Sequence, residues 1–299
     1  MAIIYRAARH EDLAPAMEVV YQSINDLMQR HGFEGLAASV TPEFLSFSLE
    51  DDPDGLWVAE DAGHVVGLGF SWVCGRFWFL ADLFVLPKYQ GQGVGGELMQ
   101  LTFDHAQKHN ADNRALITFA YNRASIGLYA KRGLFPREPL YTVGAPRAAL
   151  VGRTKKEVAW TGLDSSATQV SALKRIDEVA LGFSREKHHR YLLAEPAATG
   201  VLLEDNGSPV GYAYAWSDGH IGPLAVASHA AMGPVFRTAL ALAIDQGADK
   251  ISAFLAGSNE EAMSIALGHD MRLGRTMVLV SAKAFGDWSK YTPNDPGFM

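Results

Sequence analysis

The stretch with the clearest chemistry is a glycine-rich loop that follows a β-type run and precedes a helical one. From residue 80 to residue 98 it reads LADLFVLPKYQGQGVGGEL, and four of the six positions from Gly91 to Gly96 are glycine. Glycines let backbone N–H groups approach an anion with no Cβ in the way, and a helix N-terminus adds unpaired donors and a favourable dipole. These residue types in this order predict a binding site for a phosphate or a pyrophosphate.

The loop also satisfies the dinucleotide pattern G-x-G-x-x-G, through Gly91, Gly93 and Gly96. Its surroundings argue against a Rossmann cofactor, because residues 87–90 separate the glycines from the strand that they should follow directly. The acid that binds the ribose should end the next strand, whereas Asp112 precedes it. The β-rich runs before the loop are typical of an antiparallel meander rather than of a βαβ unit.

The loop resembles instead the acetyl-CoA loop of the GNAT N-acetyltransferase superfamily. It matches the pattern V-x-P-x-x-Q-G-x-G-x-G from Val85 on, with Asp82 ahead of it. The family's second signature is an asparagine, then a tyrosine on the following helix, then Gly-Phe. Asn122 and Tyr129 resemble it, with one leucine inserted within residues 133–135. The resemblance implies an acetyl-CoA-dependent acyltransferase.

The resemblance also implies a role for each matching position, with acetyl-CoA as cosubstrate and no metal. The backbone of the strand would pair with the pantetheine arm and polarise the thioester carbonyl, and the loop amides would hold the pyrophosphate. Tyr129 would protonate the departing thiolate, and Asp82 would take a proton from the amine, directly or through water. The cofactor-binding residues implied in this way are Leu83, Phe84, Val85, Gln90, Gly91, Gln92, Gly93, Val94, Gly95, Gly96 and Asn122.

Several of these residues have simpler interpretations that the sequence leaves open. Asp82 can be a strand carboxylate that bonds neighbouring backbone, and Tyr129 can be a helix residue that packs its ring. His105 and His109 stand four residues apart on a predicted helix, a spacing that can hold a metal. Because no cysteine or carboxylate cluster in the sequence completes such a site, we expect a solvated surface there. Cys74 is expected to be packed or to lie in a turn.

The elements that must position these residues follow from hydrophobic periodicity. Apolar residues recur at spacings of three and four over residues 11–28, which predicts a helix, and Thr41-Pro42-Glu43 is typical of a second helix start. A meander, a helix, a strand, a short helix and a last strand should follow. Their predicted ranges are 56–59, 64–72 and 77–85 for the meander, then 94–108, 115–120, 124–132 and 135–143.

The second half of the chain repeats this order and some of its residues. Trp216 follows Trp72 by 144 positions (216 − 72), and Gly211 follows Gly67 by the same number. Shared register over a matched element order predicts an internal duplication. We therefore expect an α/β (α+β) chain of two tandem GNAT-like domains, each a mixed, mostly antiparallel sheet flanked by helices. The predicted boundaries are 1–145 for the catalytic domain, 156–290 for the second domain and 291–299 for a C-terminal tail.

The second copy lacks the residues that would bind the cofactor. From Leu224 to Pro234 it has one glycine, and Pro234 has no N–H where amides should point at a phosphate. Asn259 can stand for the asparagine of the first copy, but the residue seven positions later is Ala266, which has no hydroxyl. We predict a degenerate copy that covers a sheet edge or shapes the acceptor pocket. The tail from Trp288 on is too rich in Pro, Asn and Gly for a helix and should fold back.

Composition excludes several classes of function. The net charge is −7 and no Lys/Arg-rich run occurs, which argues against a nucleic-acid partner. No stretch approaches the roughly 20 apolar residues of a membrane span. A single cysteine permits no internal disulfide, so a cytoplasmic enzyme is expected.

Together these observations predict an N-acetyltransferase that moves an acetyl group from acetyl-CoA to a primary amine of a small molecule or a peptide. A non-catalytic acyl-CoA-binding regulatory module is the alternative. The motifs leave open the identity of the acceptor amine and the choice between a monomer and a homodimer.

Overall fold

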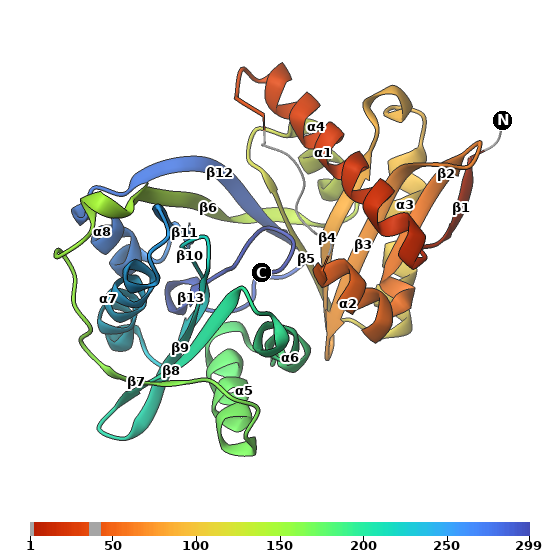
Figure 1. The fold of residues 1–299 in the computed structure, drawn as a ribbon. Helices are drawn as coiled ribbons and strands as arrows, with labels where there is room; N and C mark the ends of the chain where they lie inside the picture. Colours follow the sequence, from red (N-terminus) through yellow and green to blue (C-terminus); the bar gives the residue numbers. More distant parts are fainter. Residues whose placement is uncertain (1–2, 36–42) are drawn as a thin grey trace. The chain divides into compact units, whose positions relative to one another are not determined.

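A computed structural model describes residues 3–35 and 43–299, and the chain forms two units, Met1–Leu116 and Ile117–Met299 (Figure 1). The predicted helix start at Thr41 and Pro42 lies outside the described residues. The elements that begin in the first unit are β1 (Ile4–Ala7), α1 (Leu13–Arg30), α2 (Glu43–Asp51), β2 (Leu56–Asp61), β3 (His64–Cys74), β4 (Phe77–Val85), α3 (Val94–Lys108) and β5 (Asn113–Phe119).

The second unit continues from the end of β5. Its elements are α4 (Arg123–Ala130), β6 (Phe135–Pro146), β7 (Ala159–Gly162), α5 (Ala167–Leu181), α6 (Glu186–Ala194), β8 (Ala198–Asp205), β9 (Ser208–Trp216), β10 (His220–Val226), α7 (His229–Gln246), β11 (Lys250–Ala256), α8 (Glu260–Gly268), β12 (Arg272–Ser281) and β13 (Tyr291–Thr292). Within the described residues, no helix combines the length and the apolar composition that crossing a membrane requires.

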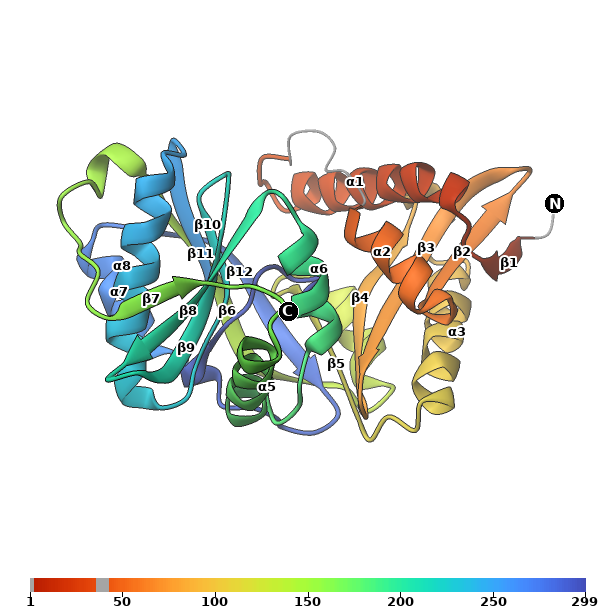
Figure 2. The ribbon, with the colours of Figure 1, turned by 60° about the horizontal axis from the view of Figure 1, so that its bottom comes forward.

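The sheet of the first unit is a meander with one parallel strand added. Strands β1 to β4 pair antiparallel in chain order, and β5 pairs parallel to β4, from Asn113 to Leu116. Figures 1 and 2 show α3 on one face of this sheet and α1 with α2 on the other. The predicted α3 range of 94–108 agrees with the structure, because the loop glycines before it and the asparagine after it limit the helix at both ends.

Close packing of α3 on the sheet depends on a small residue in β3. A Cβ at Gly67 would lie 2.9 Å from a methyl carbon of Leu98 on α3, closer than packed carbons approach. Val85 of β4 joins Leu98 in a buried cluster on the same face. Since side chains alternate along a strand, Leu83 also faces α3, and Asp82 faces the side of α1 and α2. This packing holds the start of α3 beside the end of β4.

The second unit repeats the architecture of the first. Strands β7 to β10 pair antiparallel and β11 pairs parallel to β10, as β1 to β5 do in the first unit. Gly211 of β9 has the role of Gly67, since a Cβ there would lie 3.2 Å from Val235 of α7. Helices α5 and α6 stand where α1 and α2 stand in the order of elements. The predicted duplication of the fold is confirmed, with β7 and α6 as elements that hydrophobic periodicity did not reveal.

The last strand of the first copy lies in the sheet of the second unit. Strand β6 pairs antiparallel with β11 on one side and with β12 on the other. Strand β6 continues to Pro146, because Gly144 to Pro146 are paired with β11. Contacts divide the chain at Leu116 rather than near residue 145, because α4 and β6 pack in the second unit. The limits of the two sequence repeats, residues 1–145 and 156–290, remain a prediction.

The C-terminal tail folds back, as expected. Strand β13 pairs antiparallel with β10, and Arg185 donates hydrogen bonds to the Tyr291 hydroxyl at 2.5 Å and to the carbonyl of Met299. Arg185 is fully buried and forms an ion pair with Asp177 at 3.2 Å. Burial would raise the pKa of Asp177, but Arg185 and His189 hold it well below its ordinary value. A buried charge network thus fastens the tail to the second unit.

Candidate active site

The loop between β4 and α3 contains backbone N–H groups that bond no backbone carbonyl of the described residues. Gln90 N–H bonds the carbonyl of Pro87 at 3.2 Å, and Gly96 N–H bonds the carbonyl of Gly93 at 2.9 Å. Among the described residues, the N–H groups from Gly91 to Gly95 make no hydrogen bond of this kind. Of the predicted donors from Gln90 to Gly96, the five N–H groups from Gly91 to Gly95 therefore remain as candidates for binding a phosphate.

The glycines of this loop are needed for its backbone conformation. Gly91 has a φ of +76° and Gly93 a φ of +90°, values that other residues adopt only with strain. A Cβ at either position would meet no atom of the protein within 4 Å. Gly93 is also the N-cap of α3, and no side chain caps the helix there. An exposed, uncapped helix start of this kind binds anions through its N–H groups and its dipole.

Strand β4 carries a bulge just before the predicted pantetheine-binding residues. Phe70 pairs with Asp82 but Ser71 pairs with Leu80, so Ala81 is an extra residue in β4. The parallel pairing of β4 with β5 reaches Leu80 and Leu116, directly before the bulge.

Beyond the bulge, hydrogen bonding alternates along β4. Leu86 N–H bonds the carbonyl of Val66 on β3, so Phe84 and Asp82 direct their backbone groups toward β3. Leu83 and Val85 direct theirs to the opposite edge, as a strand-like ligand requires. The Val85 carbonyl already accepts hydrogen bonds from Ser23 Oγ at 3.0 Å and Gln90 Nε2 at 2.9 Å. Of the two backbone groups of Val85, the N–H is therefore the one that remains for the predicted pairing with the pantetheine arm.

Ser23 was not found from the sequence, because it lies on α1, 62 residues before its partner. No local pattern marks a serine that bonds a distant strand.

Asp82 is half-buried on the face of the sheet that α1 and α2 cover. Its cross-strand neighbour Phe70 contacts Phe44 of α2, with ring centroids 5.8 Å apart. The carboxylate thus belongs to the same strand as Leu83 and Val85 but to the opposite face. This placement is compatible with a proton acceptor at the strand.

Asn122 and Tyr129 lie on α4 in the second unit. Asn122 is the N-cap of α4, and its side-chain oxygen accepts the N–H of Ser125 at 3.2 Å. Asn259 caps α8 in the same way, through the N–H of Ala262 at 3.2 Å. A capping role therefore explains the asparagine in both copies. Within the described residues the amide NH₂ of Asn122 donates no hydrogen bond, which leaves it for the predicted cofactor contact. Tyr129 is buried, with 5% of its surface exposed.

The second copy has a pocket at the start of α7, the helix that corresponds to α3 in the first copy. The pocket has a volume of about 510 Å³ and is lined by the starts of α7 and α8, including Glu260 and Glu261. Helix α7 begins at His229, three residues after β10 ends, so no long glycine loop separates them. The carboxylates in this lining would repel the phosphates of CoA, which agrees with a degenerate copy.

The predicted loss of a phosphate-binding N–H at Pro234 was wrong. Pro234 lies inside α7, in its second turn, and not among the N-terminal amides where a phosphate would bind. Its missing N–H therefore removes no donor from the helix start.

The expectation of a solvated surface holds for His109, which is exposed, but was wrong for His105. His105 is buried, and Asp52, which follows α2, supplies the carboxylate that the sequence did not place there. His105 and Asp52 are 53 residues apart in the chain, so no spacing pattern joins them. Cys74 is buried at the end of β3, as expected.

Comparison with known proteins links the first copy to one family. The Acetyltransferase (GNAT) family profile matches residues 20–134. The uncharacterized N-acetyltransferase YhfO of Bacillus subtilis is 30% identical over 134 residues, which are 43% of this chain and 87% of that protein. An uncharacterized N-acetyltransferase of Archaeoglobus fulgidus is 30% identical over 101 residues, 30% of this chain and 67% of the relative.

Solved structures extend the similarity to both copies. A putative acetyltransferase from Pyrococcus horikoshii has a TM-score of 0.77 at 18% identity, over 99% of this chain and 96% of the other. A tandem GNAT protein from the clavulanic acid biosynthesis pathway has a TM-score of 0.59 at 13% identity, over 95% and 98%. At these identities the similarity shows the fold, and the fold is the tandem arrangement predicted from the repeat.

Proposed function

This chain belongs to the acetyltransferase (GNAT) family and is therefore an acyltransferase, and we propose that it moves an acetyl group from acetyl-CoA to a primary amine. The acceptor is a small molecule or a peptide. The first copy carries the reaction, and the second copy binds no cofactor. The observation on which the proposal depends is the uncapped start of α3. The five loop amides from Gly91 to Gly95 form no backbone hydrogen bond within the part of the chain that the structure describes.

The residues of the loop fit acetyl-CoA. Its pyrophosphate would accept hydrogen bonds from amides between Gly91 and Gly95, where three glycines have no Cβ that would keep the phosphates away. Lys88, which is exposed and stands three residues before Gly91, adds a positive charge next to the loop in the chain. Leu83 and the N–H of Val85 would hold the pantetheine arm along β4. No residue with a carboxylate lies among the five central positions to oppose the phosphates.

Bound acetyl-CoA would supply an activated acyl carbonyl, and the chain would supply two proton transfers. Alkyl amines have pKa values near 10, so most of the acceptor is protonated at neutral pH and must lose a proton before it attacks. We assign this proton to the Asp82 carboxylate, directly or through water. The hydroxyl of Tyr129 would give a proton to the departing sulfur, and the backbone N–H of the strand would stabilise charge on the carbonyl oxygen.

A non-catalytic acyl-CoA-binding module is the competing function, and one observation favours it. Asn122 caps its helix as Asn259 does in the copy without a loop, so the asparagine needs no catalytic explanation. A binder would keep the loop but would need neither Tyr129 as an acid nor Asp82 as a base.

The two functions are separated by release of free CoA. Purified protein would be incubated with acetyl-CoA and a panel of amines, amino acids, aminoglycosides and short peptides, and free thiol would be measured. We expect amine-dependent release with at least one acceptor and formation of the corresponding N-acetyl product. Saturable acetyl-CoA binding without release across the panel would favour the binding module, and absence of binding would contradict both.

A further inference from the structure

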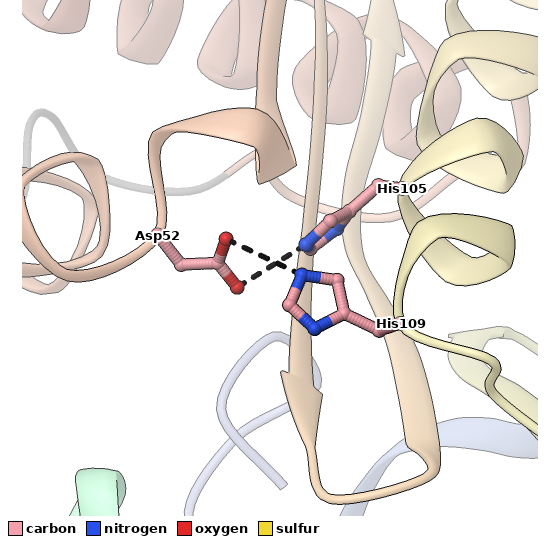
Figure 3. A group of neighbouring side chains, drawn as sticks. All are labelled: Asp52, His105 and His109. Carbon is pink, nitrogen blue, oxygen red and sulfur yellow. Dashed lines mark hydrogen bonds and ion pairs between the residues drawn. The ribbon is translucent and has the colours of Figure 1, made fainter.

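The C-terminal end of α3 carries a cluster that acetyl transfer does not use. His105 lies in the last turn of the helix, His109 is its C-cap, and Asp52 follows α2 directly. Figure 3 shows both imidazole rings turned toward the carboxylate of Asp52. Nε2 of His105 lies 3.1 Å from one carboxylate oxygen, and Nε2 of His109 lies 4.0 Å from the other.

The distances in this cluster suit a single small cation. One ligand atom from each residue lies within 4.8 Å of the other two. In a tetrahedral zinc site with bonds of about 2.05 Å, the ligand atoms stand about 3.3 Å apart. The 3.1 Å pair already meets this requirement, and the His109 side chain, 38% exposed at a helix end, can rotate to close the longer gap.

The buried member of the cluster is held in the orientation that a ligand needs. Nδ1 of His105 lies 2.9 Å from Ser71 Oγ on β3, and the opposite nitrogen, Nε2, faces Asp52. If Nδ1 carries the proton and donates it to Ser71, Nε2 has its lone pair directed at the site. Outer hydrogen bonds of this type fix the tautomer of metal-binding histidines. Both His105 and Ser71 are buried, with 3% and 1% of their surfaces exposed.

The local charges also favour a cation. The carboxylate of Asp52 brings a negative charge to the cluster. The C-terminal end of a helix carries the negative end of its dipole, which attracts a cation to His109. Lys108, the one helix cation between the two histidines, forms an ion pair with Asp54.

We propose that Asp52, His105 and His109 form a binding site for a divalent transition-metal ion, with Zn²⁺ as the best fit. Two imidazoles and one carboxylate are a common zinc ligand set, whereas Mg²⁺ and Ca²⁺ prefer oxygen ligands. Three protein ligands leave a fourth position for water. The ion joins the end of α2 to the end of α3.

This site is separate from the proposed acetyl-CoA site. Helix α3 has 15 residues, so its two ends are about 22 Å apart, and the glycine loop lies at the other end. Metal binding therefore should not require acetyl-CoA, and it can be tested whether or not the proposed activity is correct. The expected consequence is a stabilised first unit, because a ligand that binds only the folded state raises its stability.

The test is a titration of tag-free, full-length protein, stripped with a chelator and dialysed, with ZnCl₂ in a calorimeter. A parallel thermal melt records the change in unfolding temperature, and Co²⁺ in place of Zn²⁺ reports tetrahedral geometry through its visible spectrum. The informative variants are His109→Ala, whose side chain is partly exposed, and Asp52→Asn, which keeps the shape of the side chain. His64→Ala, an exposed histidine on β3 of the same unit, is the matched control.

We expect one Zn²⁺ per chain, an increased unfolding temperature and a tetrahedral Co²⁺ spectrum. Each of His109→Ala and Asp52→Asn should weaken binding at least tenfold, and His64→Ala should leave it unchanged. Absence of saturable binding would overturn the proposal. So would a folded His109→Ala variant that binds as tightly as the parent, or a His64→Ala variant that loses as much affinity as the two ligand variants.

Discussion

Replacing Gly93 with valine should weaken cofactor binding and folding for two separate reasons. Gly93 has a φ of +90° and a ψ of −12° at the N-cap of α3. An L-residue in this left-handed region costs roughly 1–2 kcal/mol, which sets the expected loss of folding stability. The protein itself adds no clash, because a Cβ at this position meets no atom within 4 Å.

The loss of affinity can be derived separately. The two methyl groups of valine would occupy the space through which a phosphate must reach the N–H groups beside them. A hydrogen bond to a charged group contributes about 1.5–3 kcal/mol, so loss of one such bond should weaken acetyl-CoA binding by at least tenfold. Titration calorimetry with acetyl-CoA measures this effect, and denaturant unfolding measures the stability of the variant.

Gly75→Val is the matched control for backbone strain. Gly75 has a φ of +59°, a Cβ there also meets no atom within 4 Å, and it lies in the turn before β4, at the opposite end of that strand from the loop. This variant should lose a comparable amount of stability and bind acetyl-CoA normally. The reasoning is refuted if Gly93→Val is folded and its dissociation constant equals that of the parent protein, or if both variants lose the same affinity.

Three further predictions concern the acid, the second copy and the stability of the first unit. Tyr129→Phe should bind acetyl-CoA almost normally but turn over roughly 10²-fold more slowly, with a changed basic limb of the pH–rate profile; an unchanged rate and profile would make Tyr129 a packing residue. Calorimetry should find one acetyl-CoA per chain, and two equivalent sites would contradict a degenerate second copy. Arg6 holds the pKa of Asp12 below its ordinary value of 3.8, through hydrogen bonds of 2.6 and 2.8 Å. Because the folded-state pKa of Asp12 is depressed, its contribution is present above about pH 4 and is lost as the pH falls through the folded-state value. Asp12→Asn should therefore lower the free energy of unfolding by about 2 kcal/mol at pH 7. Denaturant unfolding of both proteins at pH 7 and at successively lower pH should show this difference in free energy shrinking. A difference that does not depend on pH would contradict the ion pair as its cause.

Features that depend on residues adjacent in the chain could be predicted from the sequence alone. The glycine loop and its helix occupy one continuous run, so the local conformational freedom of glycine and the periodicity of apolar residues were enough to place Val94–Lys108 as a helix. The repeat was detectable because duplication keeps both element order and register, as in Gly67 and Gly211, which make the same close approach to a helix. The order of the elements, the tandem architecture and the predicted anion site follow from such local signals.

Features that depend on pairing between distant residues were decided by the tertiary structure. The hydrogen bonds of β6 are made with β11 and β12, more than 100 positions later, and a strand's own sequence does not select its neighbours. Ser23 donates a hydrogen bond to the carbonyl of Val85, 62 residues away in the chain. Asp52 completes the cluster of His105 and His109 through a contact with His105, 53 residues away. Burial and the contact with Ser71 then fix the orientation of the His105 side chain. From the sequence it had been expected at a solvated surface, because local periodicity does not reveal which distant segment will cover a helix end.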